Sequence, residues 1–510
     1  MEGNWYLLDF FGLVPWLLSL DGVRTLRGTA LCGLAMCTAF VLAIFAWFGF
    51  AIAVYSAGAA AAGIVVLALT APLLQPQFIV FAVVRFVSGR HHGPILRALV
   101  GAAAWVATEW VYPKLLADSL AHGFYPSAVL RQSADIAGTA GITFVIVLIN
   151  ESLASAVAAA RTRGARAAAF PLTAAAAITL AMVGYGQWRL SELAHAASDA
   201  KPVRVAMIQS NIAAYDRLKR EHGAYDAVRY VLDTHFEMSR DAVDHDHVDA
   251  LLWSETVFPT TFGRPKSDTG ATLDREIEDF VSRLGVPLVF GTYDRDDDGE
   301  YNSAVFLEPG AVGADPHFGV YRKTRLFFLT EYIPWWMDNS LVRAWLPWAG
   351  TWKPGPGARV LPLRVSGGRS IAVLPMICLD DVDVGLAVEG ARRGAQAIFT
   401  MSNDSWFAEH AGGAHLHLVV AAFRSIETRL PQLRVTSTGI SAVIDATGQI
   451  VASAGVGERR ALVGEIDPRN PPKTLVVLWG DWLGPSSLAF VLLAFAVPIW
   501  NGRAGRPSAR

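Results

Sequence analysis

The chain has 510 residues, of which 53% are hydrophobic, and its formal net charge is −2. A soluble globular protein of this length does not need so much apolar surface, so the composition indicates membrane-spanning segments. A nearly neutral chain also lacks the bulk positive charge on which nucleic-acid-binding proteins rely, so we expect no nucleic-acid partner.

Apolar runs divide the sequence into three predicted regions. Residues 1–189 are dominated by runs that mostly reach the ~20 residues needed to cross a bilayer core. These runs lie at 4–20, 28–54, 57–84, 96–113, 136–160 and 167–187. Residues 190–473 have a globular composition with alternating strand-like and helix-like patterns, and residues 474–510 hold one more apolar run and a basic tail. We therefore predict an N-terminal domain of about six spans, a globular domain and a C-terminal span.

Arginines in the short loops predict the orientation of these spans. By the positive-inside rule, the loops that hold them are cytoplasmic. The arginines are Arg24, Arg27, Arg85, Arg90, Arg97, Arg161, Arg163, Arg166, Arg503, Arg506 and Arg510. Counting spans from these loops puts the 190–473 domain outside the cytoplasm, in an oxidising compartment. The N-terminal MEGNWYLL has no basic region, so we expect no cleaved signal peptide.

Strand-like runs of the globular domain end in polar residues. ALLWSETVFP carries Glu255, VYRKTRLFFLTEYIP carries Lys323 and Glu331, and AVLPMI precedes Cys378. Active-site groups often lie at strand ends, because a rigid sheet aims them while the next loop leaves room for substrate. A thiol with a pKa near ~8.5 needs a base, and a desolvated carboxylate can be that base. A lysine ammonium can then stabilise the oxyanion on an attacked carbonyl.

Each of these residues also has a purely structural interpretation. A buried cysteine is usually an inert part of the core. A lone glutamate after a strand is usually a solvated turn residue, and a lysine among aromatic residues often extends its charge to water. The residue types and spacing alone therefore leave catalysis by Cys378 as one hypothesis among these.

Several segments resemble a known family. WSETVFP, YRKTRLFFLTEYIP and MICLDD, in that order, resemble the Glu–Lys–Cys motifs of the nitrilase (carbon–nitrogen hydrolase) superfamily. FTMSNDSWF (399–407) and the segment 424–451 follow the cysteine as they do in that superfamily. With the flanking apolar runs, the chain resembles the membrane-bound branch, the apolipoprotein N-acyltransferases. The resemblance implies an αββα sandwich outside the membrane, joined to a polytopic α-helical membrane domain.

The resemblance also implies roles for single residues. Cys378 would be the nucleophile, Glu255 the general base and Lys323 the cation that stabilises the oxyanion. Glu331 would support the lysine, and Asn302 in EYNSAVF matches a polar residue near the pocket.

The implied reaction takes an acyl chain from a phospholipid as a thioester and gives it to the amine of a diacylglyceryl-cysteine apolipoprotein. We expect no cofactor, a monomer, and a location in the bacterial inner membrane with the catalytic domain on the periplasmic side.

The residues after the nucleophile depart from the family pattern. The family usually has Tyr-Glu there, and this chain has Leu379-Asp380. Asp380 keeps the charge with one fewer methylene, whereas Leu379 lacks the hydroxyl. We expect this change to slow the second half-reaction, in which the acceptor amine is acylated.

Two further groups of residues have more than one interpretation. His410, His415 and His417 have a spacing that a metal could use, but the matching family segment carries histidines without a metal, so we expect no zinc site. Five tryptophans follow TEYIP, either as core and surface aromatics or as an interfacial arm over the active site, which we favour. They are Trp335, Trp336, Trp345, Trp348 and Trp352.

Two rival functions stay open. One is a membrane-tethered nitrilase-type amidase with water as the acceptor, against which the apolar runs and the tryptophans weigh. The other is a paralogue that binds lipids or lipoproteins without catalysis, against which the intact set of Glu255, Lys323 and Cys378 weighs.

Overall fold

The computed structural model describes residues 5–55, 59–112, 114, 117–195, 201–212, 215–310, 317–365, 368–407, 411–468 and 472–504. The chain forms two compact units. Unit 1 combines Met1–His195 with Leu478–Arg510, and unit 2 is Ala196–Val477.

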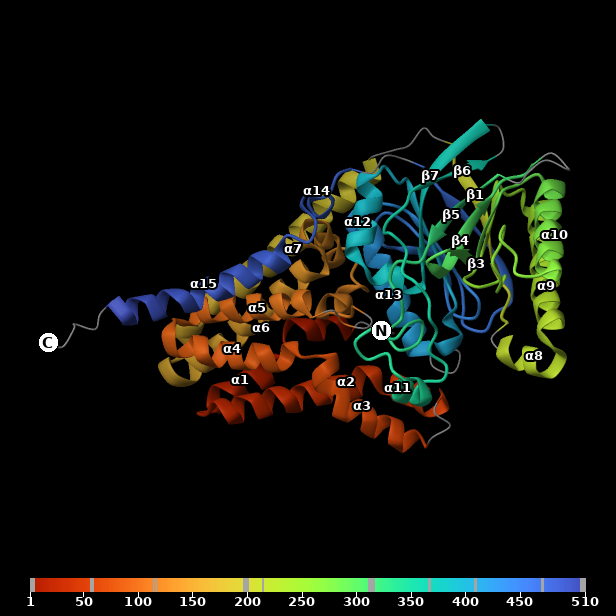
Figure 1. The fold of residues 1–510 in the computed structure, drawn as a ribbon. Helices are drawn as coiled ribbons and strands as arrows, with labels where there is room; N and C mark the ends of the chain where they lie inside the picture. Colours follow the sequence, from red (N-terminus) through yellow and green to blue (C-terminus); the bar gives the residue numbers. More distant parts are fainter. Residues whose placement is uncertain are drawn as a thin grey trace. The chain divides into compact units, whose positions relative to one another are not determined.

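Unit 1 is helical, as its apolar sequence predicts (Figure 1). Among the described residues of this unit, three stretches are long and apolar enough to cross a membrane: Leu26–Phe50, Leu130–Arg163 and Ala165–His195. The helices α3 and α4 are bent by 46° relative to each other, because Pro76 lies between them. Counted together as one broken span, they are a fourth candidate. The main helices are α1 (Val14–Gly22), α2 (Leu26–Tyr55), α3 (Ala60–Leu74), α4 (Gln77–His91), α5 (Pro94–Val111), α6 (Ala134–Arg163), α7 (Ala169–His195) and α15 (Leu483–Ala504).

Buried charges in unit 1 are paired. Arg85 on α4 lies 2.5 Å from Glu151 on α6 and 2.8 Å from Asp21 at the end of α1. An unpaired charge in such an apolar unit would be costly, so these contacts fix three helices to one another.

Unit 2 contains two six-stranded sheets. In each sheet three strands run parallel, β1-β2-β3 in one and β7-β8-β9 in the other, and the outer strands are antiparallel. The first sheet has the order β12 (Arg460–Ile466), β1 (Val203–Gln209), β2 (Ala250–Trp253), β3 (Leu288–Asp296), β4 (Gly299–Leu307), β5 (Phe318–Arg322). The second has the order β11 (Ile450–Ala454), β10 (Ser441–Ile444), β9 (Gln432–Thr436), β8 (Ala397–Ser402), β7 (Arg369–Ile377), β6 (Leu361–Val365).

The two sheets pack face to face and helices cover their outer faces. Inward side chains of both sheets, including Met207, Val373 and Phe399, form one buried core. Figure 1 shows α9 (Ala224–Asp246) and α10 (Asp268–Leu284) on one side of the strands, and α12 (Val384–Arg392) and α13 (Ala411–Thr428) on the other. The αββα sandwich implied by the resemblance is confirmed. The shorter helices of this region are α8 (Tyr215–His222), α11 (Ser340–Trp345) and α14 (Leu475–Trp479).

The strands end where the sequence predicts. Strand β2 ends two residues before Glu255, β5 ends directly before Lys323, and β7 ends directly before Cys378. The sheets therefore aim all three side chains from strand ends into the loops that follow.

Candidate active site

Lys323 is the centre of a buried polar group. Its Nζ lies 3.2 Å from Oε1 of Glu255 and 2.9 Å from Oε1 of Glu331. The Nδ2 of Asn302, on β4, donates to both of these oxygens, at 2.8 and 3.2 Å. Burial lowers the pKa of Lys323, but the neighbouring carboxylates of Glu255 and Glu331 raise it by more, so the net pKa lies well above its usual value. The site therefore holds a permanently charged ammonium between two carboxylates.

Close packing of the chain positions Glu255. A Cβ on Gly291 of β3 would lie 2.6 Å from the Glu255 Cα and 2.5 Å from the Thr256 nitrogen, so only glycine fits beside this turn. The other carboxylate oxygen of Glu255, Oε2, accepts a hydrogen bond of 2.7 Å from the Asn403 N–H, just after β8. Glu255 thus has a fixed position between the two sheets.

Cys378 begins a 3-10 turn, η6 (Cys378–Val382), and has a φ of +50°. A side chain other than glycine rarely adopts this left-handed conformation, which is found at functional sites more than elsewhere. Burial raises the pKa of the Cys378 thiol well above its usual value, Glu255 raises it further, and Lys323 opposes both. The resting thiol is therefore protonated at neutral pH and needs a base to become a nucleophile.

Asp380 connects the turn that begins at Cys378 to the loop after Lys323. Its Oδ1 accepts from the N–H groups of Thr324 and Arg325, at 3.0 and 2.7 Å. Its Oδ2 accepts from the Ile377 N–H at 3.0 Å and from the Tyr321 hydroxyl at 2.8 Å. Burial raises the pKa of Asp380 to about 7, against the lowering effect of the backbone donors. Both carboxylate oxygens are occupied by protein donors.

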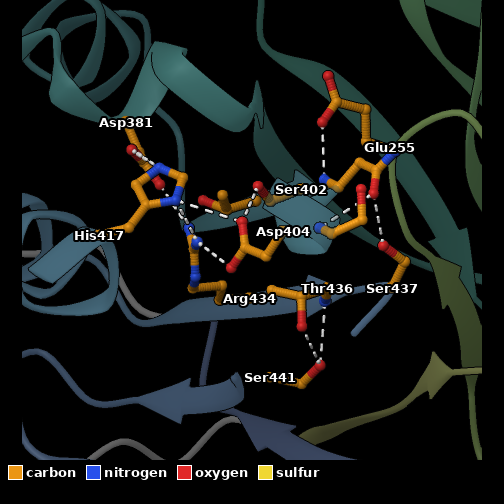
Figure 2. A network of polar contacts seen from close by, with 12 residues as sticks. Glu255, Asp381, Ser402, Asp404, His417, Arg434, Thr436, Ser437 and Ser441 are labelled. Carbon is orange, nitrogen blue, oxygen red and sulfur yellow. Dashed lines mark hydrogen bonds and ion pairs between the residues drawn. The ribbon is translucent and has the colours of Figure 1, made fainter. Parts of the chain in front are cut away.

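Four charged side chains, Asp381, Asp404, His417 and Arg434, form what we name the buried ion cluster (Figure 2). Nη1 of Arg434 lies 2.5 Å from Oδ2 of Asp381, and its Nη2 lies 3.2 Å from Oδ2 of Asp404. The His417 ring places Nε2 2.9 Å from Oδ1 of Asp381 and Nδ1 3.3 Å from Oδ1 of Asp404. Figure 2 shows Asp404 between Arg434 and Ser402, whose hydroxyl donates to Asp404 at 2.6 Å.

Comparison with known proteins identifies the family. The profile of the carbon–nitrogen hydrolases matches residues 204–470, and that of the apolipoprotein N-acyltransferase N-terminal domain matches residues 1–151. A protein of Methylococcus capsulatus named apolipoprotein N-acyltransferase is 30% identical, over 75% of this chain and 70% of its own. The chain belongs to the apolipoprotein N-acyltransferase family.

Two further matches have lower sequence identity. The apolipoprotein N-acyltransferase 2 of Treponema denticola is 25% identical, over 80% of this chain and 78% of its own. A solved structure of a Saccharomyces cerevisiae nitrilase-superfamily member is 19% identical, covers 53% of this chain and 93% of its own, and has a TM-score of 0.34.

In this member of the family, the predicted residues lie as follows. Glu255, Lys323, Glu331 and Asn302 contact one another directly. Glu255 raises the pKa of the Cys378 thiol and Lys323 lowers it. Asp380 lies fully buried beside them.

Sequence reasoning did not assign Asn403, Tyr321, Asp381, Asp404 or Arg434. The segment FTMSNDSWF was available as a signal for two of them, because it contains Asn403 and Asp404.

Three histidines, His410, His415 and His417, have a spacing that a metal could use. His417 belongs to the buried ion cluster, and His410 lies outside the described residues. Within the described ranges, no group of three or more His, Cys, Asp or Glu side chains could hold a metal ion.

Four of the five predicted arm tryptophans have exposed side chains. Trp335 is 89% exposed and Trp345 is 82% exposed, and Trp336 and Trp348 are also exposed. Trp352 is different, because its ring packs against Tyr293 with 4.4 Å between centroids. The segment around α11 thus presents an aromatic surface that water alone would not favour.

Proposed function

We propose that the protein is an apolipoprotein N-acyltransferase that works through a thioester on Cys378. The observation that carries this proposal is the charged Lys323, bound to Glu255 and Glu331, in electrostatic reach of a thiol at a strand end. Family membership supplies the substrates by analogy: a phospholipid as the acyl donor and the amine of a diacylglyceryl-cysteine apolipoprotein as the acceptor.

In the first half-reaction, Glu255 takes the proton of the Cys378 thiol as the sulfur attacks the ester carbonyl of the phospholipid. The S–C bond forms, and Lys323 stabilises the negative charge that develops on the carbonyl oxygen. The C–O bond then breaks, and Glu255 returns its proton to the departing alkoxide of the lysophospholipid. The raised thiol pKa makes this base necessary, because little thiolate exists beforehand.

In the second half-reaction, the uncharged α-amine of the acceptor attacks the thioester carbonyl. The N–C bond forms while the S–C bond breaks, and Glu255 moves the amine proton to the departing thiolate. Asn302 and Glu331 keep Lys323 and Glu255 in place during both steps, because each contacts the lysine, the catalytic carboxylate or both. The thiol is then regenerated.

The membrane location follows from the same proposal. Three apolar helices of spanning length among the described residues, together with membership of this family, favour the inner membrane. The arginine-rich loops favour a catalytic unit on the periplasmic side. The exposed Trp335, Trp336 and Trp345 suit the headgroup level, where a diacyl substrate would leave the bilayer.

The experiment that tests this function examines a lipoprotein in cells. Mass spectrometry of its N-terminus should show an amide-linked acyl chain in cells with the gene and none in cells that carry only Cys378→Ser. Release of free fatty acid without N-acylation would favour the amidase alternative. Unchanged N-acylation in the Cys378→Ser strain would exclude this chain as the enzyme.

A further inference from the structure

The buried ion cluster lies next to both reacting groups. Asp381 is in the same 3-10 turn as Cys378, three residues further along the chain. Asp404 directly follows Asn403, whose N–H binds the Glu255 carboxylate at 2.7 Å. The cluster therefore joins the nucleophile turn, which follows β7, to the loop that receives the base, which follows β8.

The two cations of the cluster bridge its two acids. Arg434, on β9, binds Asp381 with one nitrogen and Asp404 with another. His417, on α13, does the same with its two ring nitrogens. Each acid is thus bound by both cations, and neither can move without breaking two contacts. All four side chains are at most 5% exposed, so water cannot replace a lost contact.

The charges of the cluster balance when His417 is protonated. The charged groups that face its ring are Asp381, Asp404 and Arg434, whose Nη2 lies 2.8 Å from Nδ1. Burial lowers the pKa of His417, but the two acids raise it to about 9 against the opposing charge of Arg434. Two N–H donors cannot face each other at 2.8 Å, so protonation of His417 at Nδ1 requires Nη2 of Arg434 to turn away from the ring toward Oδ2 of Asp404. The histidine and the arginine then share Asp404 through its two oxygens.

Close packing also holds the Asp404 carboxylate of the cluster in place. A Cβ on Gly439 would lie 2.4 Å from Oδ2 of Asp404, so only glycine leaves room for this carboxylate. From the same loop as Gly439, the hydroxyl of Ser437 donates to the side-chain oxygen of Asn403 at 2.9 Å.

We propose that His417 and Arg434 are positioning residues, which hold the Cys378 turn and the Glu255-binding loop at one separation through Asp381 and Asp404. Their ion pairs run to Asp381 and Asp404, so they act on the site through the two loops, and the charge of Arg434 also interacts with Cys378. Stability alone is a weak reason for such a cluster, because well-packed apolar residues can often replace buried ion pairs without loss. A fixed distance between a nucleophile and its base is a stronger one, because a shift of about 1 Å can cost on the order of 100-fold in rate.

The test measures the reactivity of Cys378 in the full-length protein in detergent micelles. A Cys32→Ala/Cys37→Ala background leaves Cys378 as the one thiol in the sequence. The rate of alkylation by iodoacetamide is followed across a pH series, together with thioester formation from phospholipid and the melting temperature. The variants are His417→Gln, the charge-balanced Asp381→Asn/His417→Gln, and His415→Gln as a control on the same helix.

The proposal predicts that His417→Gln slows alkylation at neutral pH and thioester formation by roughly 10- to 100-fold, with the KM for phospholipid unchanged. His415→Gln should match the background protein in all measurements. The double variant should recover its melting temperature, because its charges balance, yet remain slow, because the turn has lost its links. This combination separates positioning from folding, even if His417→Gln alone does not fold.

Either of two results would overturn the proposal: alkylation as fast as in the background in a His417→Gln protein that keeps a cooperative melting transition, or recovery of both rate and melting temperature in the double variant. The catalytic meaning of the positioning role rests on the proposed function, but the effect on the alkylation of Cys378 does not. Alkylation needs no acyl donor, so a protein that alkylates normally but forms no thioester would refute the proposed function and leave the positioning test intact.

Discussion

Replacing Asp380 by asparagine should weaken both the fold and the reaction. The carboxylate accepts from four donors, and asparagine keeps only one oxygen. If that oxygen faces the N–H groups of Thr324 and Arg325, the new NH2 group faces the Ile377 N–H and the Tyr321 hydroxyl. The hydroxyl can rotate and accept from the amide, but the Ile377 N–H cannot, and it lies in a fully buried place.

The expected loss of stability follows from the Ile377 N–H, which is left without an acceptor. A buried group left without its partner costs about 1–3 kcal/mol, and the loss of charge-assisted bonds adds to this. Ile377 directly precedes Cys378, and Thr324 directly follows Lys323, so the same change loosens the position of Cys378 relative to Lys323. We expect thioester formation to fall by roughly 10- to 100-fold.

The assay compares Asp380→Asn with two matched variants by thermal unfolding and by the rate of thioester formation. Tyr321→Phe removes a single donor and should cost about 1 kcal/mol. Asp297→Asn changes an exposed acid on the same unit and should change neither quantity. A stable Asp380→Asn protein with wild-type kinetics would refute the reasoning, because it would show that the four donors do not need the carboxylate.

Three other predictions concern pH, topology and the lipid surface. The pKa of His417 is raised from 6.5 to about 9 in the folded protein, so the stability that its protonation contributes is complete below about pH 6.5 and is lost as the pH rises through 9. Melting curves should therefore show that the wild type loses about 3 kcal/mol of stability relative to His417→Gln between these pH values. Stability curves that run parallel for the two proteins would contradict this prediction. Asp297→Cys should react with a membrane-impermeant reagent on intact spheroplasts if unit 2 is periplasmic, and labelling only after lysis would reverse the orientation. Trp335→Ala/Trp345→Ala should raise the KM for vesicle phospholipid several-fold without changing the alkylation of Cys378, and an unchanged KM would remove the role of the aromatic surface.

Some parts of the site could be predicted because their signal is local. Glu255, Lys323 and Cys378 each follow an apolar run, and the strands end at these positions. Asn302 and Glu331 came from the family motifs, since no local pattern brings a β4 side chain to a loop residue 29 positions away.

Other parts depend on contacts that the sequence does not display. Arg434 lies within the strand segment QLRVT, where the sequence alone predicts a solvent-facing arginine. In the structure it is fully buried, because Asp381 and Asp404 form ion pairs with it. Asn403 binds the Glu255 carboxylate through its backbone N–H, a group that every residue except proline has. Trp352 looked like its neighbours in sequence, but only the fold places Tyr293 against its ring.

The central claim, an acyl thioester on Cys378 that passes to a lipoprotein amine, is tested most directly on the peptide that contains this cysteine. The purified full-length protein is incubated with phospholipid vesicles and digested, and the peptide is weighed by mass spectrometry before and after a diacylglyceryl-cysteine peptide is added. The account predicts a hydroxylamine-sensitive acyl mass on Cys378 that disappears as the acceptor gains the same mass on its amine. An acceptor that becomes N-acylated while Cys378→Ala works equally well would contradict it.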